Sequence, residues 1–145
     1  LARQPRLAGL KHLNRLEQVL ARAEWAAEYA EGLMRDTEGY VIEGTMSNLF
    51  LVARGVLHTP ELSQSGVAGV MRAQVLDRAR AAGIEWRETW LKPAELESAD
   101  EIFLTNSLIG VWPVRSLSSR EYAIGPITQT IQKALAAAGC VTLAR

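Results

Sequence analysis

Stretches with helical spacing of apolar residues alternate with stretches typical of β-strands along the whole chain, and this alternation restricts the fold more than any other feature. The helical stretches are residues 14–30, 70–82, 93–98 and 127–138, and the strand-like stretches are 33–35, 40–43, 48–53, 56–59, 84–90 and 101–105. The first four strands pair off around two short turns, which predicts two hairpins. No internal repeat or low-complexity linker separates these stretches. The sequence therefore predicts one mixed α/β (α+β) domain over residues 1–145, with strands and packed helices.

The balance of charge excludes several classes of partner. The chain has 16 basic and 16 acidic residues, so neither nucleic acid nor a membrane surface is an expected partner. No apolar run approaches the roughly 20 residues that cross a bilayer. A single cysteine, Cys140, excludes an internal disulfide, and His12 and His58 are too isolated to form a metal site. These features favour a cytoplasmic protein without a bound metal.

Two residues could carry the chemistry of a reaction. Lys11 lies between apolar Leu10 and the start of a helix, where partial desolvation would lower the pKa of its amine and make it a nucleophile. The alternative is a lysine whose amine simply reaches solvent. Glu43 ends a hydrophobic strand and precedes Gly44. Its carboxylate could bind a protonated ring nitrogen, or it could be a solvated residue at a strand end.

Two loops could bind a phosphate group. Residues 65–72 form a glycine-containing loop that leads into a helix, and backbone N–H groups at a helix N-terminus attract phosphate. The loop lacks the lysine of a P-loop and does not complete a dinucleotide fingerprint, so an ordinary turn is the alternative. Thr105, Asn106 and Ser107 follow a strand and could add hydroxyl and amide donors, or only cap a turn.

Taken together and in order, five features resemble the fold-type IV pyridoxal-phosphate enzymes. They are Lys11, the run Glu-Gly-Thr-Met-Ser-Asn-Leu-Phe at 43–50, Thr-Pro at 59–60, Gly-Val-Ala-Gly-Val-Met-Arg at 66–72 and Ala-Asp-Glu-Ile-Phe-Leu-Thr-Asn at 99–106. The resemblance covers nearly the whole chain and implies the C-terminal large domain, which binds the cofactor. Because the chain begins with Leu1 rather than methionine, we expect it to be a fragment that lacks the family's smaller N-terminal domain. The family also implies a homodimer.

The resemblance assigns roles to the residues that surround the cofactor ring. Lys11 would form the Schiff base with pyridoxal 5'-phosphate, and Glu43 would bind the pyridine nitrogen and keep it protonated. Val67 would lie near the ring. Asn48 would brace the turn that follows Glu43.

The resemblance also implies how the phosphate is held. The backbone N–H groups of Val70 and Met71 would bind it from the start of a helix, with Asn106 and Ser107 adding donors from a neighbouring loop. Met71 stands where many relatives carry threonine, so one hydroxyl contact to the phosphate would be absent.

Within the family, the run Leu-Ala-Gly-Leu-Lys-His-Leu-Asn-Arg-Leu-Glu-Gln-Val-Leu at 7–20 is similar to aminodeoxychorismate lyases, because aminotransferases more often have an aromatic residue where this chain has Arg15. The implied reaction converts a small molecule, 4-amino-4-deoxychorismate, to 4-aminobenzoate and pyruvate in folate biosynthesis. Lys11 would also act as general base, and Arg15 is a candidate for substrate binding. Two alternatives stay open: a branched-chain or D-amino acid aminotransferase that uses the same site, and a non-catalytic binding domain that kept the fold.

Overall fold

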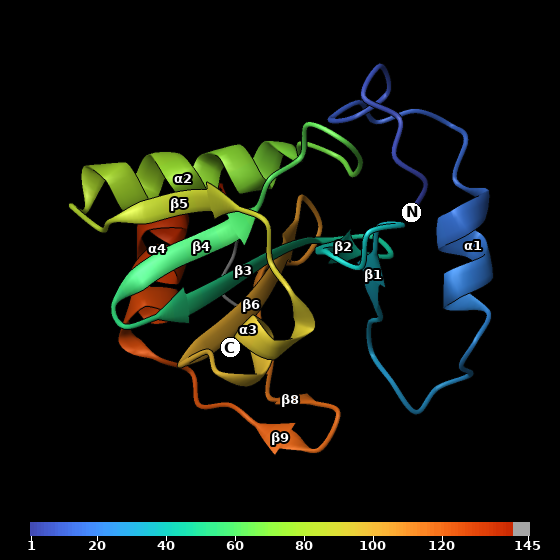
Figure 1. Cartoon of the computed structure of the whole chain (residues 1–145). Coiled ribbons are helices and arrows are strands. Elements are labelled where there is room, and N and C mark those ends of the chain that lie inside the picture. The colour runs from blue at the N-terminus through green and yellow to red at the C-terminus, as the bar shows by residue number, and fades with distance from the viewer. Residues whose placement is uncertain (141–145) are drawn as a thin grey trace.

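The computed structural model describes residues 1–140, in which a seven-stranded sheet carries helices on both faces (Figure 1). The helices are α1 (Leu16–Arg22), α2 (Val70–Ala81), α3 (Pro93–Glu97) and α4 (Pro126–Ala137). The strands of the large sheet are β1 (Leu33–Arg35), β2 (Val41–Gly44), β3 (Asn48–Ala53), β4 (Val56–Pro60), β5 (Trp86–Thr89), β6 (Glu101–Asn106) and β7 (Gly110–Pro113), and a small hairpin joins β8 (Ser116–Leu117) to β9 (Arg120–Glu121). No helix within residues 1–140 is long and apolar enough to cross a membrane.

The two predicted hairpins and three of the four predicted helices are confirmed, with bounds that agree to within one or two residues. Strand β3 lies at the centre of the sheet and pairs antiparallel with β4 on one side and β6 on the other. At its start, Asn48 lies opposite Glu43 of β2. Strands β4 and β5 are parallel, so the chain must cross over between them, and α2 makes this crossover. Helix α2 therefore begins just beyond the carboxyl end of β4 (Figure 1).

Alternating side chains of β3 supply the two apolar clusters that hold the fold together. On one face, Phe50 packs under α2 and α4 and stacks on Phe103 of β6, with ring centroids 4.9 Å apart. On the other face, Leu49 and Leu51 pack with residues of β6 and α3. The strict period of two along a strand explains this division, because neighbouring residues point to opposite faces. The sheet is buried on both faces, which fixes the register of β3 and of the residues at its start.

The helix predicted over residues 14–30 is wrong in its extent, because α1 ends at Arg22. Beyond Arg22, side chains form the hydrogen bonds to backbone groups that a continued helix would have formed. Arg22 donates to the carbonyls of Trp25 and Ala26, and Glu28 accepts from the N–H of Ala27. The alanines that gave this stretch its helical spacing are mostly exposed. A helix draws most of its stability from the packing of its apolar face, so this stretch has little to hold it in helical form.

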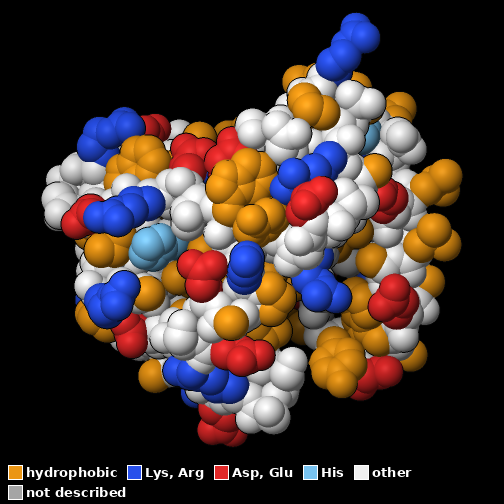
Figure 2. Space-filling model, viewed as in Figure 1, with side chains coloured by type: hydrophobic (Ala, Val, Ile, Leu, Met, Phe, Trp, Pro, Cys, Tyr) orange, Lys and Arg blue, Asp and Glu red, His pale blue; other side chains and the backbone are white. Residues whose placement is uncertain are grey.

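The leucine face of α1 is not packed on the described part of the chain. Leu16, Val19 and Leu20 are 69%, 60% and 69% exposed, and hydrophobic side chains are seen on the surface there, at the right of Figure 2. The buried residue of α1 is instead Gln18. The face that the sequence marks as apolar is therefore open in this structure, and a polar residue on the other side faces the sheet.

Strands β7, β8 and β9 have no counterpart in the sequence-based expectation. Strand β7 is bounded by Gly110 and Pro113, two residues that usually argue against a strand. It forms because Val111 and Trp112 lie opposite Thr105 and Leu104 at the sheet edge, where the missing N–H of proline can be tolerated. Each of these strands is only two to four residues long and pairs with its neighbour in the chain, β7 with β6 and β8 with β9, so the sequence carries too short a pattern to indicate them.

Candidate active site

The loop formed by residues 66–69 is the point at which three distant parts of the sequence meet. The N–H of Gly9 donates to the carbonyl of Gly66 at 2.9 Å, and the N–H of Ala68 donates to the carbonyl of Gly9 at 3.0 Å. Gly9 and Val67 thus form a short parallel bridge. Lys11 follows two residues after this bridge, so the segment that carries the candidate nucleophile is held beside Val67. Lys11 itself is exposed, so residues 1–140 do not provide the desolvation that its position suggested.

Glu43 is the most deeply buried charged residue of the candidate site, at 2% exposure. Its Oε2 accepts a hydrogen bond from the N–H of Val67 at 2.8 Å, while its Oε1 lies 3.4 Å from Nε2 of Gln18 and 3.6 Å from the guanidinium of Arg15. Burial raises the pKa of the Glu43 carboxyl, and the Val67 N–H and the Arg15 charge oppose that rise. The reading of Glu43 as a solvated strand-end residue is therefore wrong.

Asn48 holds the loop from the side opposite to Gly9. Its Nδ2 donates to the carbonyl of Val67 at 2.7 Å. Its Oδ1 lies so close to Gly69 that a Cβ there would come within 2.2 Å of it. Asn48 thus has a structural role, as expected, but its side chain braces the loop at 66–69 rather than the turn after Glu43. Glycine at position 69 is what permits this close approach.

The first backbone N–H groups of α2 have no side-chain acceptor among the described residues, whereas those of α4 have one. Both helices begin after a glycine, Gly69 and Gly125, with no cap from that residue. In α4 the Glu101 carboxylate accepts from the N–H groups of Ile127 and Thr128. Among the described residues, no side chain accepts from the first N–H groups of α2, which belong to Val70 and Met71. Free donors at a helix N-terminus, together with the helix dipole, suit an anion such as phosphate, and the binding of phosphate here stays a prediction.

The predicted second set of donors is located at the carboxyl end of β6. Asn106 uses its side chain within the protein: Oδ1 accepts from the N–H groups of Leu108 and Ile109, and Nδ2 donates to the carbonyl of Met46. Ser107 is exposed in the turn that follows. A phosphate contact from this loop would therefore come from Ser107 or from backbone N–H groups, and the role of the Asn106 side chain in binding stays a prediction.

Thr105 is the first of the three residues that the sequence offered as hydroxyl and amide donors, and its hydroxyl faces the protein interior. The residue is fully buried and its Oγ1 has no hydrogen-bond partner within residues 1–140. Thr105 lies directly opposite Asn48 in the sheet, so both side chains point to the same face. Gln18 is the residue of the site that the sequence did not reveal, because it lies in a run that apolar spacing assigned to a helix.

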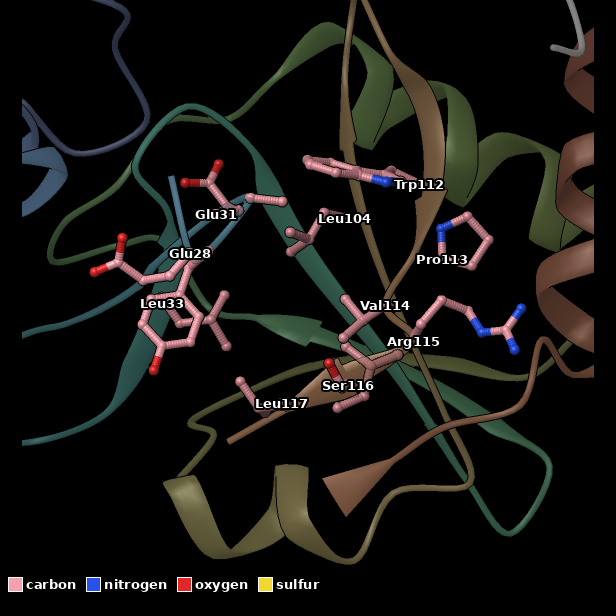
Figure 3. Close-up of a pocket in the computed structure, with 13 residues that line it drawn as sticks. Glu28, Glu31, Leu33, Leu104, Trp112, Pro113, Val114, Arg115, Ser116 and Leu117 are labelled. Carbon is pink, nitrogen blue, oxygen red and sulfur yellow. The ribbon is translucent and has the colours of Figure 1, made fainter. Parts of the chain in front are cut away.

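Two cavities flank these residues. One, of about 270 Å³, is bordered by Arg15, Gln18 and Gly66, and also by His12 and Ser65, whose Nδ1 and Oγ have no partner in the described chain. The other, of about 340 Å³, lies on the far side of the sheet. Its wall runs from Glu28 and Glu31 past Leu104 and Trp112 to Leu117 (Figure 3). The first cavity is bordered by Arg15 and Gln18, the two side chains that contact Glu43, and it is therefore the space nearest to the predicted site.

A family model for amino-transferase class IV matches residues 2–117. The chain belongs to this family. Among class IV proteins, the aminodeoxychorismate lyase of Vibrio harveyi is 43% identical over 134 residues, which are 89% of this chain and 49% of that protein. The crystal structure of 4-amino-4-deoxychorismate lyase from Pseudomonas aeruginosa is 54% identical, with a TM-score of 0.90 over 93% of this chain and 50% of that one.

A second branch of class IV is also similar to this chain. The branched-chain amino acid aminotransferase from Escherichia coli is 36% identical, with a TM-score of 0.78 over 83% of this chain and 42% of that one. A further branched-chain aminotransferase structure, 32% identical, holds pyridoxamine 5'-phosphate. The chain spans about half the length of the lyases that it matches. The expected fold, a mixed α/β class IV domain, is confirmed by these structures.

Proposed function

We propose that this chain is the C-terminal, cofactor-binding domain of a pyridoxal-phosphate-dependent aminodeoxychorismate lyase. The reaction converts 4-amino-4-deoxychorismate to 4-aminobenzoate and pyruvate. One observation carries the proposal: the loop at 66–69 joins the Lys11 segment, the buried Glu43 carboxylate and the open N-terminus of α2. Among the solved structures the identity is 54% to the lyase from Pseudomonas aeruginosa and 36% to the aminotransferase from Escherichia coli. Among the curated sequences it is 43% to the lyase of Vibrio harveyi and 39% to that aminotransferase, and both comparisons favour the lyase branch.

The residues of the site fit pyridoxal 5'-phosphate. The free N–H groups of Val70 and Met71 suit its phosphate, with Ser107 and Asn106 on the neighbouring loop. Glu43 suits the protonated pyridine nitrogen, because a buried carboxylate gains most from a cation that is brought into contact with it. Val67, whose N–H holds Glu43, would lie against the ring.

The reaction assigns distinct tasks to the residues of this chain. When bound, pyridoxal phosphate supplies the electron sink that acidifies a C–H bond of the substrate. We assign to Nζ of Lys11 both the attachment of the cofactor and the removal of the proton from the substrate ring carbon. Breakage of the C–O bond to the enolpyruvyl group then releases pyruvate and leaves an aromatic ring. No amino acceptor is consumed, and this separates the reaction from transamination.

Arg15 is proposed as a contact for a substrate carboxylate. Its side chain is 30% exposed and its guanidinium lies 3.6 Å from Glu43, so it borders the site and still reaches solvent. We further propose a cytoplasmic homodimer. The exposed leucine face of α1 supports an additional contact on that side, and sedimentation equilibrium of the full-length enzyme would measure the oligomeric state.

The test uses the full-length enzyme with 4-amino-4-deoxychorismate and no keto acid, and follows pyruvate and 4-aminobenzoate together. We expect equal release of both products, and a loss of about 100-fold or more in Lys11→Ala, since general acid–base catalysis contributes about 10²–10⁴-fold. The matched control is Lys133→Ala, which removes an exposed lysine on α4 and should keep full activity.

Each other outcome points to one of the alternatives. Amino transfer that begins only after a keto acid is added would assign the enzyme to the aminotransferase branch. Failure to bind pyridoxal phosphate and to turn over either substrate would make it a binding domain.

A further inference from the structure

The Glu31 carboxylate gathers an unusual number of hydrogen bonds from one turn. Its Oε1 accepts from the N–H of Thr45 at 3.1 Å and from the Thr45 hydroxyl at 2.5 Å, and from its neighbour Gly32 at 3.0 Å. Its Oε2 accepts from the Ser47 hydroxyl at 2.9 Å and from the N–H of Met46 at 3.3 Å. Four of these five donors belong to residues 45–47, the turn between β2 and β3. All five donors are neutral groups, and no cation pairs with Glu31 among residues 1–140.

This turn is packed against Glu31 without room for adjustment. The N–H of Gly44 donates to the carbonyl of Ser47 at 2.7 Å and closes the turn. A Cβ on Gly44 would come within 2.3 Å of the Ser47 hydroxyl and 2.9 Å of Glu31 Oε2. The carbonyl of Gly32 accepts a further hydrogen bond from the N–H of Thr45. Segment 31–32 therefore fixes the conformation of the turn through both its backbone and its side chain.

The turn connects both halves of the cofactor site. It follows Glu43 directly in the chain, and Glu43 is the residue proposed for the pyridine nitrogen. On its other side, the carbonyl of Met46 accepts the Nδ2 hydrogen bond of Asn106 at 3.1 Å, which joins the turn to the loop proposed to add phosphate donors. A shift of residues 45–47 would thus move groups at both ends of the cofactor. Glu31 acts from behind the turn, in the wall of the cavity shown in Figure 3.

We propose that Glu31 is a positioning residue of the active site, which sets the separation between Glu43 and the loop at 106–107 by holding the turn at 45–47. The inference rests on the proposed function, because the ligand that spans these two groups is pyridoxal phosphate. Glu31 itself contacts neither the cofactor nor the substrate. It keeps the two contacts at the spacing that the cofactor requires before the cofactor arrives.

The experiment compares Glu31→Gln with Glu101→Gln in the full-length enzyme. Glu101 is a matched control because its carboxylate also accepts several backbone and hydroxyl donors, those of Ile127 and Thr128, but at the end of β6 remote from Asn106. Both variants should lower the melting temperature of the apoenzyme. In Glu31→Gln the dissociation constant of pyridoxal phosphate should rise about tenfold, since hydrogen bonds to charged groups are the stronger ones. In Glu101→Gln that constant should stay at the wild-type value.

A second readout reports geometry rather than stability. The visible circular dichroism band of the bound cofactor should change in Glu31→Gln and stay unchanged in Glu101→Gln. If Glu31→Gln does not fold, Thr45→Val removes one hydroxyl donor at constant volume and should give the same two effects to a smaller degree. Wild-type affinity and an unchanged band in the Glu31 and Thr45 variants would overturn the inference. Wild-type enzyme that binds no cofactor would instead overturn the proposed function.

Discussion

At the scale of single residues, Glu43 shows a conflict between stability and binding. Its carboxylate is buried, and its one cationic neighbour among the described residues, Arg15, is 3.6 Å away. Burial raises the pKa of this carboxyl, which means that the folded protein holds its charged form at a cost. A bound cation at the same position would remove that cost. The residue is thus better suited to the complex than to the free protein.

Glu43→Gln should therefore stabilise the apoenzyme while it weakens cofactor binding. The pKa of Glu43 is higher in the folded protein than in the unfolded chain. The contribution of this carboxyl to the unfolding free energy is therefore fully present below its ordinary pKa and is lost as the pH rises through the folded pKa. At pH 8 the variant should exceed the wild type by on the order of 1 kcal/mol in unfolding free energy, and at pH 4 the difference should vanish. Urea unfolding at both pH values measures this. A variant less stable than the wild type at pH 8 would contradict the argument.

At the scale of elements, the two long helices present their N-termini in opposite ways. Helix α4 has its first N–H groups filled by Glu101, whereas α2 keeps those of Val70 and Met71 free within the described part of the chain. In both cases the preceding glycine allows another side chain to lie where a Cβ would be: Asn48 at Gly69, and Glu101 at Gly125. One helix start is closed by the protein, and the other is the one that we propose for the cofactor phosphate.

Alanine substitutions at Gly69 and Gly125 should separate the effect on stability, which both helix starts share, from the effect on cofactor binding, which only α2 should show. Gly69→Ala and Gly125→Ala both introduce a Cβ within about 2 Å of a fixed side chain, so each should lower the unfolding free energy by about 1–3 kcal/mol. Only Gly69→Ala displaces Asn48 and the loop at 66–69, and its affinity for pyridoxal phosphate should fall about tenfold or more. Fluorescence titration of the two apoenzymes checks this. Equal affinities in both variants would count against the phosphate site at α2.

Local sequence patterns predicted the helices and strands whose own residues carry a clear apolar pattern. The continuous apolar run of β3 and the apolar residues of α2 and α4 were sufficient for this. They failed at α1, where side chains of Arg22 and Glu28 end the helix, and at β7, which exists only through its pairing with β6. The role of Glu31 could not be predicted, because its partners lie 14 to 16 positions away. The family resemblance, and no local pattern, predicted that the Lys11 segment, Glu43 and the start of α2 belong to one site.

At the scale of the whole molecule, the sheet separates two apolar clusters, and the stacked pair Phe50 and Phe103 lies at the centre of one of them. Both rings are fully buried, with an angle of 9° between their planes. They link the two central strands β3 and β6 to the layer formed by α2 and α4. The residues of the site stand at the ends of these same strands, Asn48 at the start of β3 and Asn106 at the end of β6.

Phe103→Ala should lower the unfolding free energy by about 3–5 kcal/mol, as expected when a buried aromatic ring leaves a cavity. Phe103→Leu keeps most of the volume and should cost about 1–2 kcal/mol. Chemical denaturation followed by far-ultraviolet circular dichroism measures both. Cofactor affinity per folded molecule should change little in the leucine variant, because the backbone at Thr105 and Asn106 stays in place. A loss below about 1 kcal/mol in the alanine variant would show that this cluster is not the main core.

The bridge between Gly9 and Val67 attaches the Lys11 segment to the rest of the molecule at the rim of the sheet, outside both apolar clusters. Lys11, proposed for both cofactor attachment and proton transfer, thus lies on a segment outside the core, whereas the strands that carry Glu43 and Asn106 run into the core. Substitutions beside Lys11 should therefore leave the packing that keeps the domain folded in place. We therefore expect changes of reaction type to be easier to engineer in this segment than at the strand ends, where a substitution would also disturb the core.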